Sequence, residues 1–494
     1  MSRGVIRLLR RGRILEISAL SPMRTLLDHL RLTEHAMGTK EGCNEGDCGA
    51  CTVALGSVRD GRLVYEPVNA CILLAGQADG KELVTVDDLN AADGTLHPVQ
   101  QALVDHHGSQ CGFCTPGIVM SLFTLYQRGG GTPDWRQAVD QLAGNLCRCT
   151  GYRPIVAAAQ QACSAPPDDA WSRHAAETSR RLTALADGED IFIGTSDRFL
   201  AAPASLSALR ALTRAHKDVV FVAGATDVGL WITKQLRDLP RIILLGRISG
   251  LDHIAEGPDE VSLGGGVTYA RAETALRQID PDLGELLRRL GSKQVRASGT
   301  VGGNIANGSP IGDTPPALIA LGAAIEITDG ESTRTLPLED FFIAYGRQDR
   351  RPEEIVWRIT IPTLGRNESF RCYKISKRFD QDISAVMGAF KLTIDSGRIM
   401  EARIAYGGMA ATPQRAAAAE HAVIGQTIGD AALAGRAGEA LLRDFKPLDD
   451  HRASAAYRME TAQALLTRAL TEIAGVPSQD TRIVGWREAN ADAA

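Results

Sequence analysis

The spacing of hydrophobic and polar residues changes character along this chain. Up to about residue 86, short strand-like runs surround one helical stretch, MRTLLDHLRL; the runs are VIRLL, ILEI, CTVAL, RLVYEPV and ELVTVDDL. From about residue 92 to 163 the pattern is helical in HPVQQALVDHH, TPGIVMSLFTLYQRG, WRQAVDQLAGN and YRPIVAAAQQA. This predicts a small α+β sheet domain followed by four helices, the second with Thr115 as N-cap and Pro116 in its first turn.

The rest of the chain follows a different pattern. Prolines and aspartates in CSAPPDDAWSRH predict a linker. From about residue 190 strands, glycine-rich loops and helices alternate, and the sequence beyond residue 415 is rich in helical spacing. We therefore predict a multidomain α+β protein with segments at 1–86 and 87–163, a linker at 164–190, further segments at 191–366 and 367–480, and a tail at 481–494.

Composition and charge narrow the class of protein. The 494 residues exceed one ordinary core, because a domain typically has about 150 residues. No apolar run approaches the roughly 20 residues of a membrane span, and a net charge of −5 provides no basic surface for nucleic acid. We expect neither a membrane nor a nucleic acid as partner.

The first twenty residues, MSRGVIRLLRRGRILEISAL, have the arginines of a signal peptide but not its continuous apolar segment. A β-hairpin is the expected structure, since four arginines interrupt the apolar residues. We therefore expect a cytoplasmic location, where thiols stay reduced and cysteines do not form a disulfide framework. The ten cysteines suggest metal ligands instead.

Eight of the ten cysteines lie in the first third of the chain and form two groups of four. The first group has CxxxxCxxC spacing within GCNEGDCGACTV and a later fourth cysteine, which is typical of plant-type [2Fe–2S] ferredoxins. Glycines in this loop allow positive φ and let N–H groups turn toward sulfur. The loop is predicted to bind a cluster, through Cys43, Cys48, Cys51 and Cys71.

The second group combines CGFC with CRC, and each half precedes a predicted helix start. A CxC pair fits zinc poorly, because zinc ligands are usually two to four residues apart. Helix N-termini are positive and would suit an anionic, thiolate-bound cluster. Structural zinc or buried thiols stay open as alternatives at this point, whereas Cys163 and Cys372 have no partners at ligand spacing.

Two glycine-rich stretches dominate the middle of the chain, FVAGATDVGLW and SGTVGGNIANGSPIGDTPPALIALGA. Glycines at this density allow close backbone approach to a ligand such as a pyrophosphate, although tight turns without a ligand would have the same pattern. LGGGVTYA lacks the closing glycine of a Rossmann fingerprint. FAD is the expected cofactor, because a flavin links one-electron iron–sulfur carriers with the two-electron chemistry of nicotinamide.

Six motifs carry a resemblance to a known family: GCNEGDCGACTV, SQCGFCTPG, NLCRCTGYRPI, AGATDVGLWITKQLRDLP, TVGGNIANGSPIGDTPPALIALGA and YKISKRFDQDISAV. In this order, over residues 1 to about 475, the chain resembles iron–sulfur/FAD subunits of the molybdenum hydroxylase family, in particular its bacterial xanthine-oxidising members. The resemblance implies a β-grasp ferredoxin domain at 1–86, a four-helix [2Fe–2S] domain at 87–163, and a two-part α+β FAD domain at 191–366 and 367–480.

The resemblance also implies site residues. The second cluster, nearer molybdenum in the family, would be held by Cys111, Cys114, Cys147 and Cys149. FAD would be contacted by Ala223, Gly224, Ala225, Thr226, Asp227, Thr300, Val301, Gly302, Gly303, Asn304, Ser309 and Asp313. Lys374 matches a lysine near the flavin ring, and Asp382 an acidic residue at the flavin edge approached by NAD. Ala225 stands where relatives often have glycine or asparagine, so we expect its φ to be negative.

The implied function is an electron relay. Electrons from hypoxanthine or xanthine would leave a molybdenum cofactor on a separate large subunit and pass through two [2Fe–2S] clusters and FAD to NAD+. The family suggests a heterotetramer of two small and two large subunits. Two other hypotheses stay open: the subunit of another molybdenum hydroxylase, acting on an aldehyde, carbon monoxide or an aromatic substrate, and a zinc-binding interaction scaffold.

Overall fold

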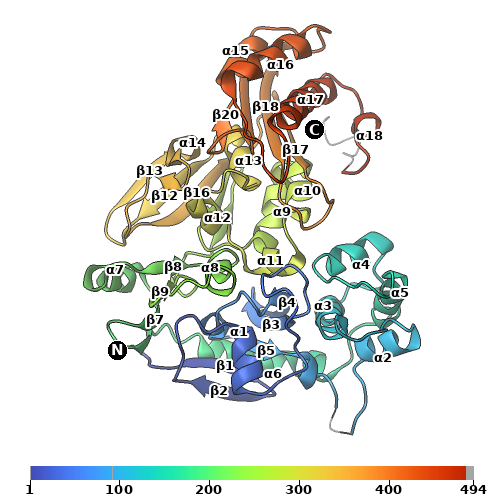
Figure 1. Ribbon diagram of the computed structural model, residues 1–494, viewed down its shortest axis with the longest axis vertical. Helices are drawn as coiled ribbons and strands as arrows, with labels where there is room; N and C mark the ends of the chain where they lie inside the picture. The colour runs from blue at the N-terminus through green and yellow to red at the C-terminus, as the bar shows by residue number, and fades with distance from the viewer. Residues whose placement is uncertain (1, 92, 486–494) are drawn as a thin grey trace. The chain divides into compact units, whose positions relative to one another are not determined.

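The computed structural model describes residues 2–91 and 93–485 (Figure 1). The chain forms two compact units, each built from two separate stretches of sequence. Unit 1 comprises Met1–Ser249 and Gly291–Gly299, and unit 2 comprises Gly250–Leu290 and Thr300–Ala494. Residues 486–494 of the predicted tail lie outside the described residues. No helix of the described ranges is both long and apolar enough to cross a membrane.

Unit 1 begins with a five-stranded mixed sheet in the order β2-β1-β5-β3-β4. Strand β1 pairs in parallel with β5, and β5 pairs antiparallel with β3. A short helix, α1, continues into a π-helical turn, and their leucines Leu26, Leu27 and Leu30 are buried against the sheet. This is the predicted β-grasp domain; its elements are β1 (Ile6–Arg10), β2 (Arg13–Ile17), α1 (Leu26–Asp28), β3 (Thr52–Arg59), β4 (Arg62–Asn69) and β5 (Glu82–Val84).

The four predicted helices follow, and α3 packs on strands β3 and β4 as well as on helices α2 and α4 (Figure 1). Ten consecutive residues of α3, 117–126, are buried, so this helix contacts neighbours on all sides. Its N-cap is Cys114, one position earlier than the predicted cap Thr115, which is the first residue of the helix. The helices are α2 (Pro98–Asp105), α3 (Thr115–Arg128), α4 (Trp135–Leu142) and α5 (Arg153–Ala162); the predicted linker contains α6 (Ala170–Leu185).

A four-stranded sheet in the order β6-β7-β9-β8 completes unit 1. Strands β7, β9 and β8 run in parallel, so their connections are crossovers that include helices α7 and α8. The first glycine-rich stretch is the loop between β8 and α8. The elements are β6 (Ile191–Gly194), β7 (Phe199–Ala202), α7 (Leu206–Ala215), β8 (Val220–Val222), α8 (Val228–Thr233), β9 (Arg241–Leu244) and, from the second stretch of unit 1, α11 (Lys293–Ser298).

Unit 2 contains a five-stranded sheet in the order β10-β11-β16-β12-β13. Helix α13 is apolar on every side, and all its residues are buried in the core beside this sheet. The elements are β10 (Ile254–Glu256), β11 (Glu260–Gly264), α9 (Tyr269–Ile279), α10 (Pro281–Arg288), α12 (Val301–Asn307), α13 (Thr314–Leu321), β12 (Ala324–Thr328), β13 (Thr333–Pro337), α14 (Leu338–Phe341), β14 (Phe342–Ala344), β15 (Arg347–Gln348) and β16 (Ile355–Pro362).

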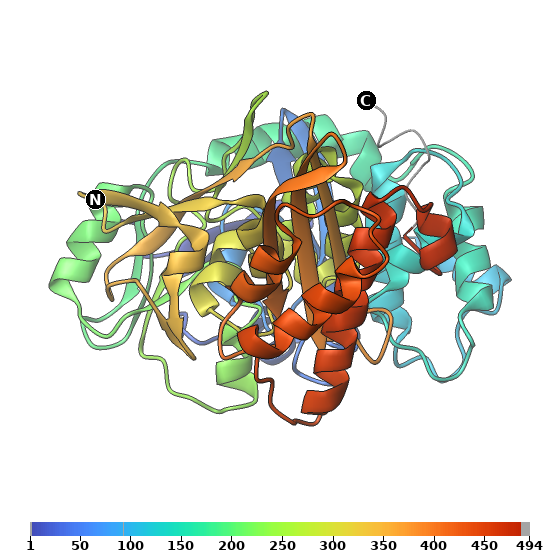
Figure 2. The same cartoon turned by 90° about the horizontal axis from the view of Figure 1, so that it is seen from above.

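The second sheet of unit 2 is an antiparallel meander, β17-β18-β19-β20. Helices α15, α16 and α17 cover one face of it and form a common core with β18 and β19 (Figure 2). Together with the preceding sheet this makes the predicted two-part α+β arrangement. The elements are β17 (Glu368–Ile375), β18 (Val386–Asp395), β19 (Arg398–Gly407), β20 (Gln414–Arg415), α15 (Ala417–Val423), α16 (Leu433–Asp444), α17 (Ala455–Ile473) and α18 (Ser478–Thr481).

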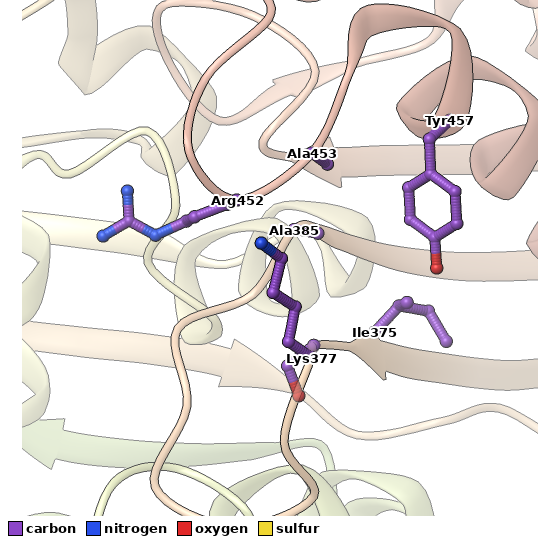
Figure 3. A pocket seen from close by; sticks show the side chains of 7 residues that line it. Ile375, Lys377, Ala385, Arg452, Ala453 and Tyr457 are labelled. Carbon is purple, nitrogen blue, oxygen red and sulfur yellow. The ribbon is translucent and has the colours of Figure 1, made fainter.

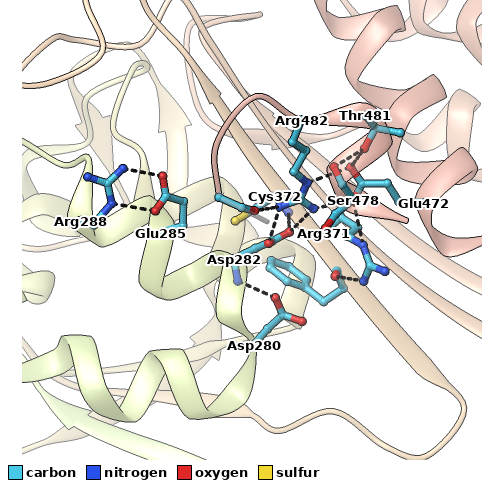
Figure 4. A network of polar contacts seen from close by, with 12 residues as sticks. Asp280, Asp282, Glu285, Arg288, Arg371, Cys372, Glu472, Ser478, Thr481 and Arg482 are labelled. Carbon is cyan, nitrogen blue, oxygen red and sulfur yellow. Dashed lines mark hydrogen bonds and ion pairs between the residues drawn. The ribbon is translucent and has the colours of Figure 1, made fainter. Parts of the chain in front are cut away.

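A buried polar network fastens the end of the described chain within unit 2 (Figure 4). The guanidinium of Arg482 donates to both carboxylate oxygens of Asp282 in α10, at 2.7 and 3.0 Å, and to Glu472 in α17 at 2.8 Å. Arg371 of β17 donates to the same Glu472 at 3.2 Å. The network therefore joins segments that lie up to 200 residues apart in the sequence.

Candidate functional site

The first cysteine group lies at one end of the β3–β4 hairpin. Cys51 directly precedes β3 and Cys71 follows β4, and the pairing of Thr52 with Asn69 brings these two ends together. Cys51 and Cys71 are buried, whereas Cys43 and Cys48 are half-buried in the preceding loop. Antiparallel pairing is therefore what delivers the fourth cysteine to the other three.

The thiols of this group face one another. Contacts with the thiols of Cys48 and Cys71 lower the pKa of Cys43, and contacts with Cys43 and Cys51 raise that of Cys71. Backbone N–H groups of Asp47 and Cys48 donate to Cys43 Sγ at 3.4 and 3.3 Å. Donation from backbone N–H groups to sulfur stabilises thiolate and cluster sulfur, so the four residues fit a [2Fe–2S] cluster.

Glycines shape this loop as predicted. Gly46 and Gly49 have positive φ of 78° and 71°. A Cβ on Gly42 would lie 2.7 Å from Cys48 Sγ, and one on Gly49 would lie 2.0 Å from the carbonyl oxygen of Gly144. Side chains at these positions would displace a cysteine or the neighbouring backbone.

The second cysteine group joins the loop before α3 to the loop before α5. Cys111 contacts Cys149, and Cys114 contacts Cys147, so each contact links one loop to the other. Burial, together with the contact to Cys147, raises the pKa of Cys114 to about 12. Cys111 and Cys149 are exposed, whereas Cys114 and Cys147 are half-buried. Among residues 2–91 and 93–485, no three His, Cys, Asp or Glu side chains form a site for a single metal ion.

Tyr152 supports the second group and was not predicted from the sequence. Its hydroxyl accepts from Cys147 N at 2.7 Å and donates to Asn145 O at 3.2 Å. Its backbone has a positive φ of 66°, which costs about 1–2 kcal/mol for a residue with a side chain. A tyrosine after a glycine in TGYRP is the one sequence signal that could have pointed to it.

The two cysteine loops are in direct contact. Leu146 N donates to Cys48 O at 2.9 Å, and Asn145 Nδ2 donates to Gly49 O at 3.2 Å. A Cβ on Gly117 of α3 would lie 2.0 Å from Gly49 O, so the absence of a side chain lets α3 approach the first loop. A single hydrogen bond and one intervening residue therefore separate Cys48 from Cys147.

The first glycine-rich loop, residues 223–227, follows β8 and packs on the β-grasp domain within unit 1. Gln77 Nε2 donates to Ala223 O at 2.9 Å, a contact that sequence reasoning missed. A Cβ on Gly224 would lie 2.1 Å from Ser298 O. Thr226 follows these residues in the loop, and Asp227 is the N-cap of α8. Burial raises the pKa of Asp227, and its contact with Trp231 opposes the shift.

The expected negative φ of Ala225 is wrong. Its φ is 63°, and the residue is buried, with its carbonyl accepting from Gly229 N at 2.7 Å. The turn into α8 requires the left-handed conformation at this position, which is why glycine or asparagine suits it.

The second glycine-rich stretch lies in unit 2 and forms α12 and the loop after it. Thr300 caps α12 by accepting from Gly303 N at 3.0 Å, and Val301 is fully buried. A Cβ on Gly302 would lie 2.5 Å from Gly265 O, so this glycine permits backbone packing. Beside Thr300, the buried hydroxyl of Thr268 has no hydrogen-bond partner among the described residues. An unpartnered buried hydroxyl here fits a ligand with polar groups such as FAD.

Asp313 connects predicted residues that are far apart in the sequence. Lys374 Nζ lies 2.5 Å from Asp313 Oδ2, and Ser384 Oγ donates to Asp313 Oδ1 at 2.5 Å. Asn304 Oδ1 accepts from Thr314 Oγ1, next to Asp313, at 3.1 Å, and Ser309 Oγ accepts from a backbone N–H in the intervening loop. Asp313 thus holds both ends of the β17–β18 loop.

Asp382 lies on that β17–β18 loop. Partial burial opposes ionisation, but the N–H groups of Arg378 and Ile383 donate to its carboxylate and lower its pKa. At the base of the loop is a cavity of about 210 Å³, lined on one side by Ile375 and Lys377 and on the other by Arg452 and Tyr457 (Figure 3).

Three protein families match the chain in succession. Residues 85–160 match the [2Fe-2S] binding domain. Residues 196–364 match the FAD binding domain in molybdopterin dehydrogenase, and residues 371–473 match the CO dehydrogenase flavoprotein C-terminal domain.

Curated relatives and solved structures agree with these matches. Xanthine dehydrogenase of Drosophila subobscura is 31% identical over 94% of this chain and 39% of the relative. Xanthine dehydrogenase/oxidase of Rattus norvegicus is 31% identical over 79% of this chain and 33% of the relative. The chain thus spans between a third and two fifths of the length of these relatives.

The solved structures cover a shorter part of this chain. Carbon monoxide dehydrogenase from Hydrogenophaga pseudoflava has a chain with a TM-score of 0.52 and 26% identity, covering 55% of this chain and 95% of that chain. Quinoline 2-oxidoreductase from Pseudomonas putida 86 has one with a TM-score of 0.51 and 26% identity, covering 55% and 95%.

The fold and the matched families therefore define an iron–sulfur flavoprotein with separate [2Fe–2S] and FAD-binding domains. The iron–sulfur match favours a cluster over structural zinc. The succession of the three matched domains fits an iron–sulfur/FAD subunit of the molybdenum hydroxylase family.

Proposed function

We propose that this chain is the electron-transfer subunit of an NAD+-dependent xanthine dehydrogenase. It would receive electrons from hypoxanthine or xanthine oxidised at a molybdenum cofactor on a partner subunit, through two [2Fe–2S] clusters and FAD. The observation that carries the proposal is the direct contact of two four-cysteine loops, together with the packing of the first flavin loop on the β-grasp domain. Short distances between successive redox groups are the physical requirement of a relay.

The cysteines of each group would be the cluster ligands: Cys43, Cys48, Cys51 and Cys71 for one, and Cys111, Cys114, Cys147 and Cys149 for the other. Backbone N–H groups at Cys43 Sγ and the hydroxyl contact of Thr150 with Cys147 Sγ at 3.2 Å would tune the potentials, since hydrogen bonds to sulfur favour the reduced state.

FAD would be held by residues 223–227 and 300–304, with Ser309, Asp313 and Lys374. A flavin supplies the exchange between single electrons and the electron pair of a hydride. The role of this chain is to hold the cofactor: Asp313 fixes the Lys374 ammonium, and Asp382, kept ionised by its lowered pKa, would face the nicotinamide.

The partner would be a large subunit that binds the molybdenum cofactor, in an assembly of two small and two large subunits in the cytoplasm. The curated relatives are more than twice as long as this chain, which leaves room in them for such a domain. In unit 1 the second cysteine group is the more accessible one, and Phe113 and Leu146 beside it are 50% and 49% exposed. Exposed apolar residues next to exposed thiols suit docking of an electron donor.

A second candidate is the same role in another molybdenum hydroxylase, because the matched solved structures are a carbon monoxide dehydrogenase and a quinoline oxidoreductase. Each of those chains is covered almost completely by only about half of this chain. The presence of cysteine loops and flavin loops on one chain matches the xanthine dehydrogenase relatives, which favours xanthine.

The test is purification of the chain alone and with its co-purifying partner under anaerobic conditions. We expect four irons, four acid-labile sulfides and one FAD per chain, and transfer of electrons from NADH to a dye without the partner. Xanthine oxidation should require the partner. A colourless protein that contains zinc, or xanthine hydroxylation by the isolated chain, would overturn the proposal; oxidation of another substrate by the complete assembly would support the second candidate.

A further inference from the structure

We infer that Gln294 is a positioning residue that sets the two cysteine loops and the first flavin loop at a fixed separation within unit 1. The inference rests on the proposed function, because it concerns the distance between the redox groups that these loops would hold. It arises from the location of helix α11, a short segment that belongs to unit 1 although the stretches before and after it in the sequence belong to unit 2.

Helix α11 lies within the region matched by the FAD-binding family, yet it belongs to unit 1 and packs against β4 of the β-grasp domain. Ala297 contacts the apolar core that contains Cys51 and Cys71. At the start of the helix, Lys293 N donates to Ala143 O, two residues before Asn145, at 3.1 Å. The flavin region therefore contributes a segment to the cluster-binding part of the molecule.

The side chain of Gln294 contacts residues next to both cysteine groups. Its side chain is fully buried, and Nε2 lies 3.1 Å from Thr52 Oγ1, 3.2 Å from Ser121 Oγ and 3.0 Å from Asn145 Oδ1. Thr52 directly follows Cys51 of the first group. Ser121 lies on the helix that begins after Cys114, and Asn145 lies two residues before Cys147. The amide of Gln294 therefore contacts residues that position both cysteine groups.

These partners are also bonded to one another. Ser121 Oγ donates to Asn145 Oδ1 at 2.6 Å, and Thr52 Oγ1 donates to Gly49 O at 2.6 Å. A Cβ on Gly144 would lie 2.1 Å from Gln294 Oε1, so glycine is needed for the amide to fit. Gln294 thus joins a buried hydrogen-bond network that lies between the two cysteine loops.

The other end of α11 reaches the first flavin loop. The carbonyl of Ser298 is the atom that a Cβ on Gly224 would meet at 2.1 Å. Ser298 Oγ donates back to Gln294 O at 3.3 Å, which ties the two ends of the helix together. A six-residue helix is about 9 Å long, so α11 is a short rigid spacer between the cysteine loops and this flavin loop. Electron tunnelling rates fall exponentially with distance, which makes such a spacer functionally important.

The experiment compares wild type with Gln294→Leu and with the matched control Gln141→Leu. Gln141 is also buried and its amide donates to Ser121 O and Thr124 Oγ1, but all of these contacts stay within the four-helix domain. The protein carries both clusters and FAD and is reduced anaerobically with dithionite. Low-temperature EPR then measures the magnetic splitting between the two reduced clusters, which depends on the distance and direction between them.

We expect the splitting to change in Gln294→Leu and to equal the wild-type value in Gln141→Leu, although both variants lower the unfolding temperature. In stopped-flow mixing with NADH, bleaching of the clusters should slow on the order of tenfold in Gln294→Leu, while flavin bleaching keeps its rate. If Gln294→Leu does not fold, Gln294→Met keeps the volume and should give the same result.

Wild-type splitting and wild-type cluster reduction in the Gln294 variants would overturn the inference and leave the proposed function intact. Wild-type protein without two distinct cluster signals would overturn both. Equal changes in the Gln141 and Gln294 variants would also overturn it, because the effect would then be one of general stability.

Discussion

At the scale of single residues, Ala225 is a strained position in the first flavin loop. An alanine with φ of 63° is less stable than glycine there by about 1 kcal/mol, because its Cβ crowds the following carbonyl in the left-handed conformation. The strain is stored at the loop that we propose contacts FAD.

We predict that Ala225→Gly stabilises the protein by about 1 kcal/mol, seen as a higher midpoint of thermal unfolding of the FAD-free chain. The control is Ala223→Gly in the same loop. Ala223 does not have a positive φ, so its replacement should lower the midpoint through added backbone entropy. A destabilised Ala225→Gly variant would contradict the strain argument.

At the scale of elements, close backbone contact between the two cysteine loops depends on glycines. Gly49 faces both Gly144 and Gly117, and each contact is with backbone that cannot rotate away. The side chain of Asn145 then bonds the two loops together, and the Tyr152 hydroxyl bonds to the backbone within the second loop.

We predict that Gly49→Ala destabilises unit 1 by about 2–3 kcal/mol and lowers the iron content of the purified chain, because its Cβ would overlap the Gly144 carbonyl. Gly61→Ala is the matched control. Gly61 has a similar φ of 74°, but no atom lies within 4 Å of its Cβ position, so only the conformational cost of about 1 kcal/mol applies. Thermal unfolding and iron analysis measure both; equal losses in the two variants would refute the steric explanation.

At the scale of the whole molecule, unit 2 is assembled from two separate stretches of sequence, and the network around Arg482 joins their ends. Arg482, Asp282 and Glu472 have side chains that are 6%, 2% and 1% exposed. Removing one partner of such a network leaves buried charge without compensation, which is costly.

We predict that Arg482→Met destabilises unit 2 by about 3–5 kcal/mol at pH 7. The control Arg173→Met removes an exposed ion pair with Asp168 and should cost less than about 1 kcal/mol.

This stabilisation depends on pH. Burial of Glu472 opposes its ionisation, but hydrogen bonds from Arg482 outweigh burial and lower the pKa of Glu472 from its usual 4.5. The stabilisation is therefore complete above pH 4.5 and is lost as pH falls through the lowered pKa, so the difference between wild type and Arg482→Met should shrink in acid. Thermal unfolding at several pH values measures it, and a constant difference would contradict the assignment.

The sequence by itself determined the types of domain and the two groups of cysteines. Hydrophobic spacing is a local property, and so are the ligand spacings within CxxxxCxxC, CGFC and CRC, because they reflect one turn of backbone around one bound group. The glycine-rich stretches were also visible, although the reason for Gly224 and Gly302 proved to be contact with another backbone segment.

Only the tertiary structure decided how separate segments meet. Several contacts join residues that are 38 to 242 positions apart. They are the contact of Cys111 with Cys149, the bonds of Asp313 with Lys374 and Ser384, and the bonds of Gln294 with Thr52 and Asn145. The positive φ of Ala225 likewise follows from the turn into α8 rather than from its own preference. Such contacts are set by the packing of whole sheets and helices, which depends on the sum of many weak interactions and leaves no pattern in a short stretch of sequence.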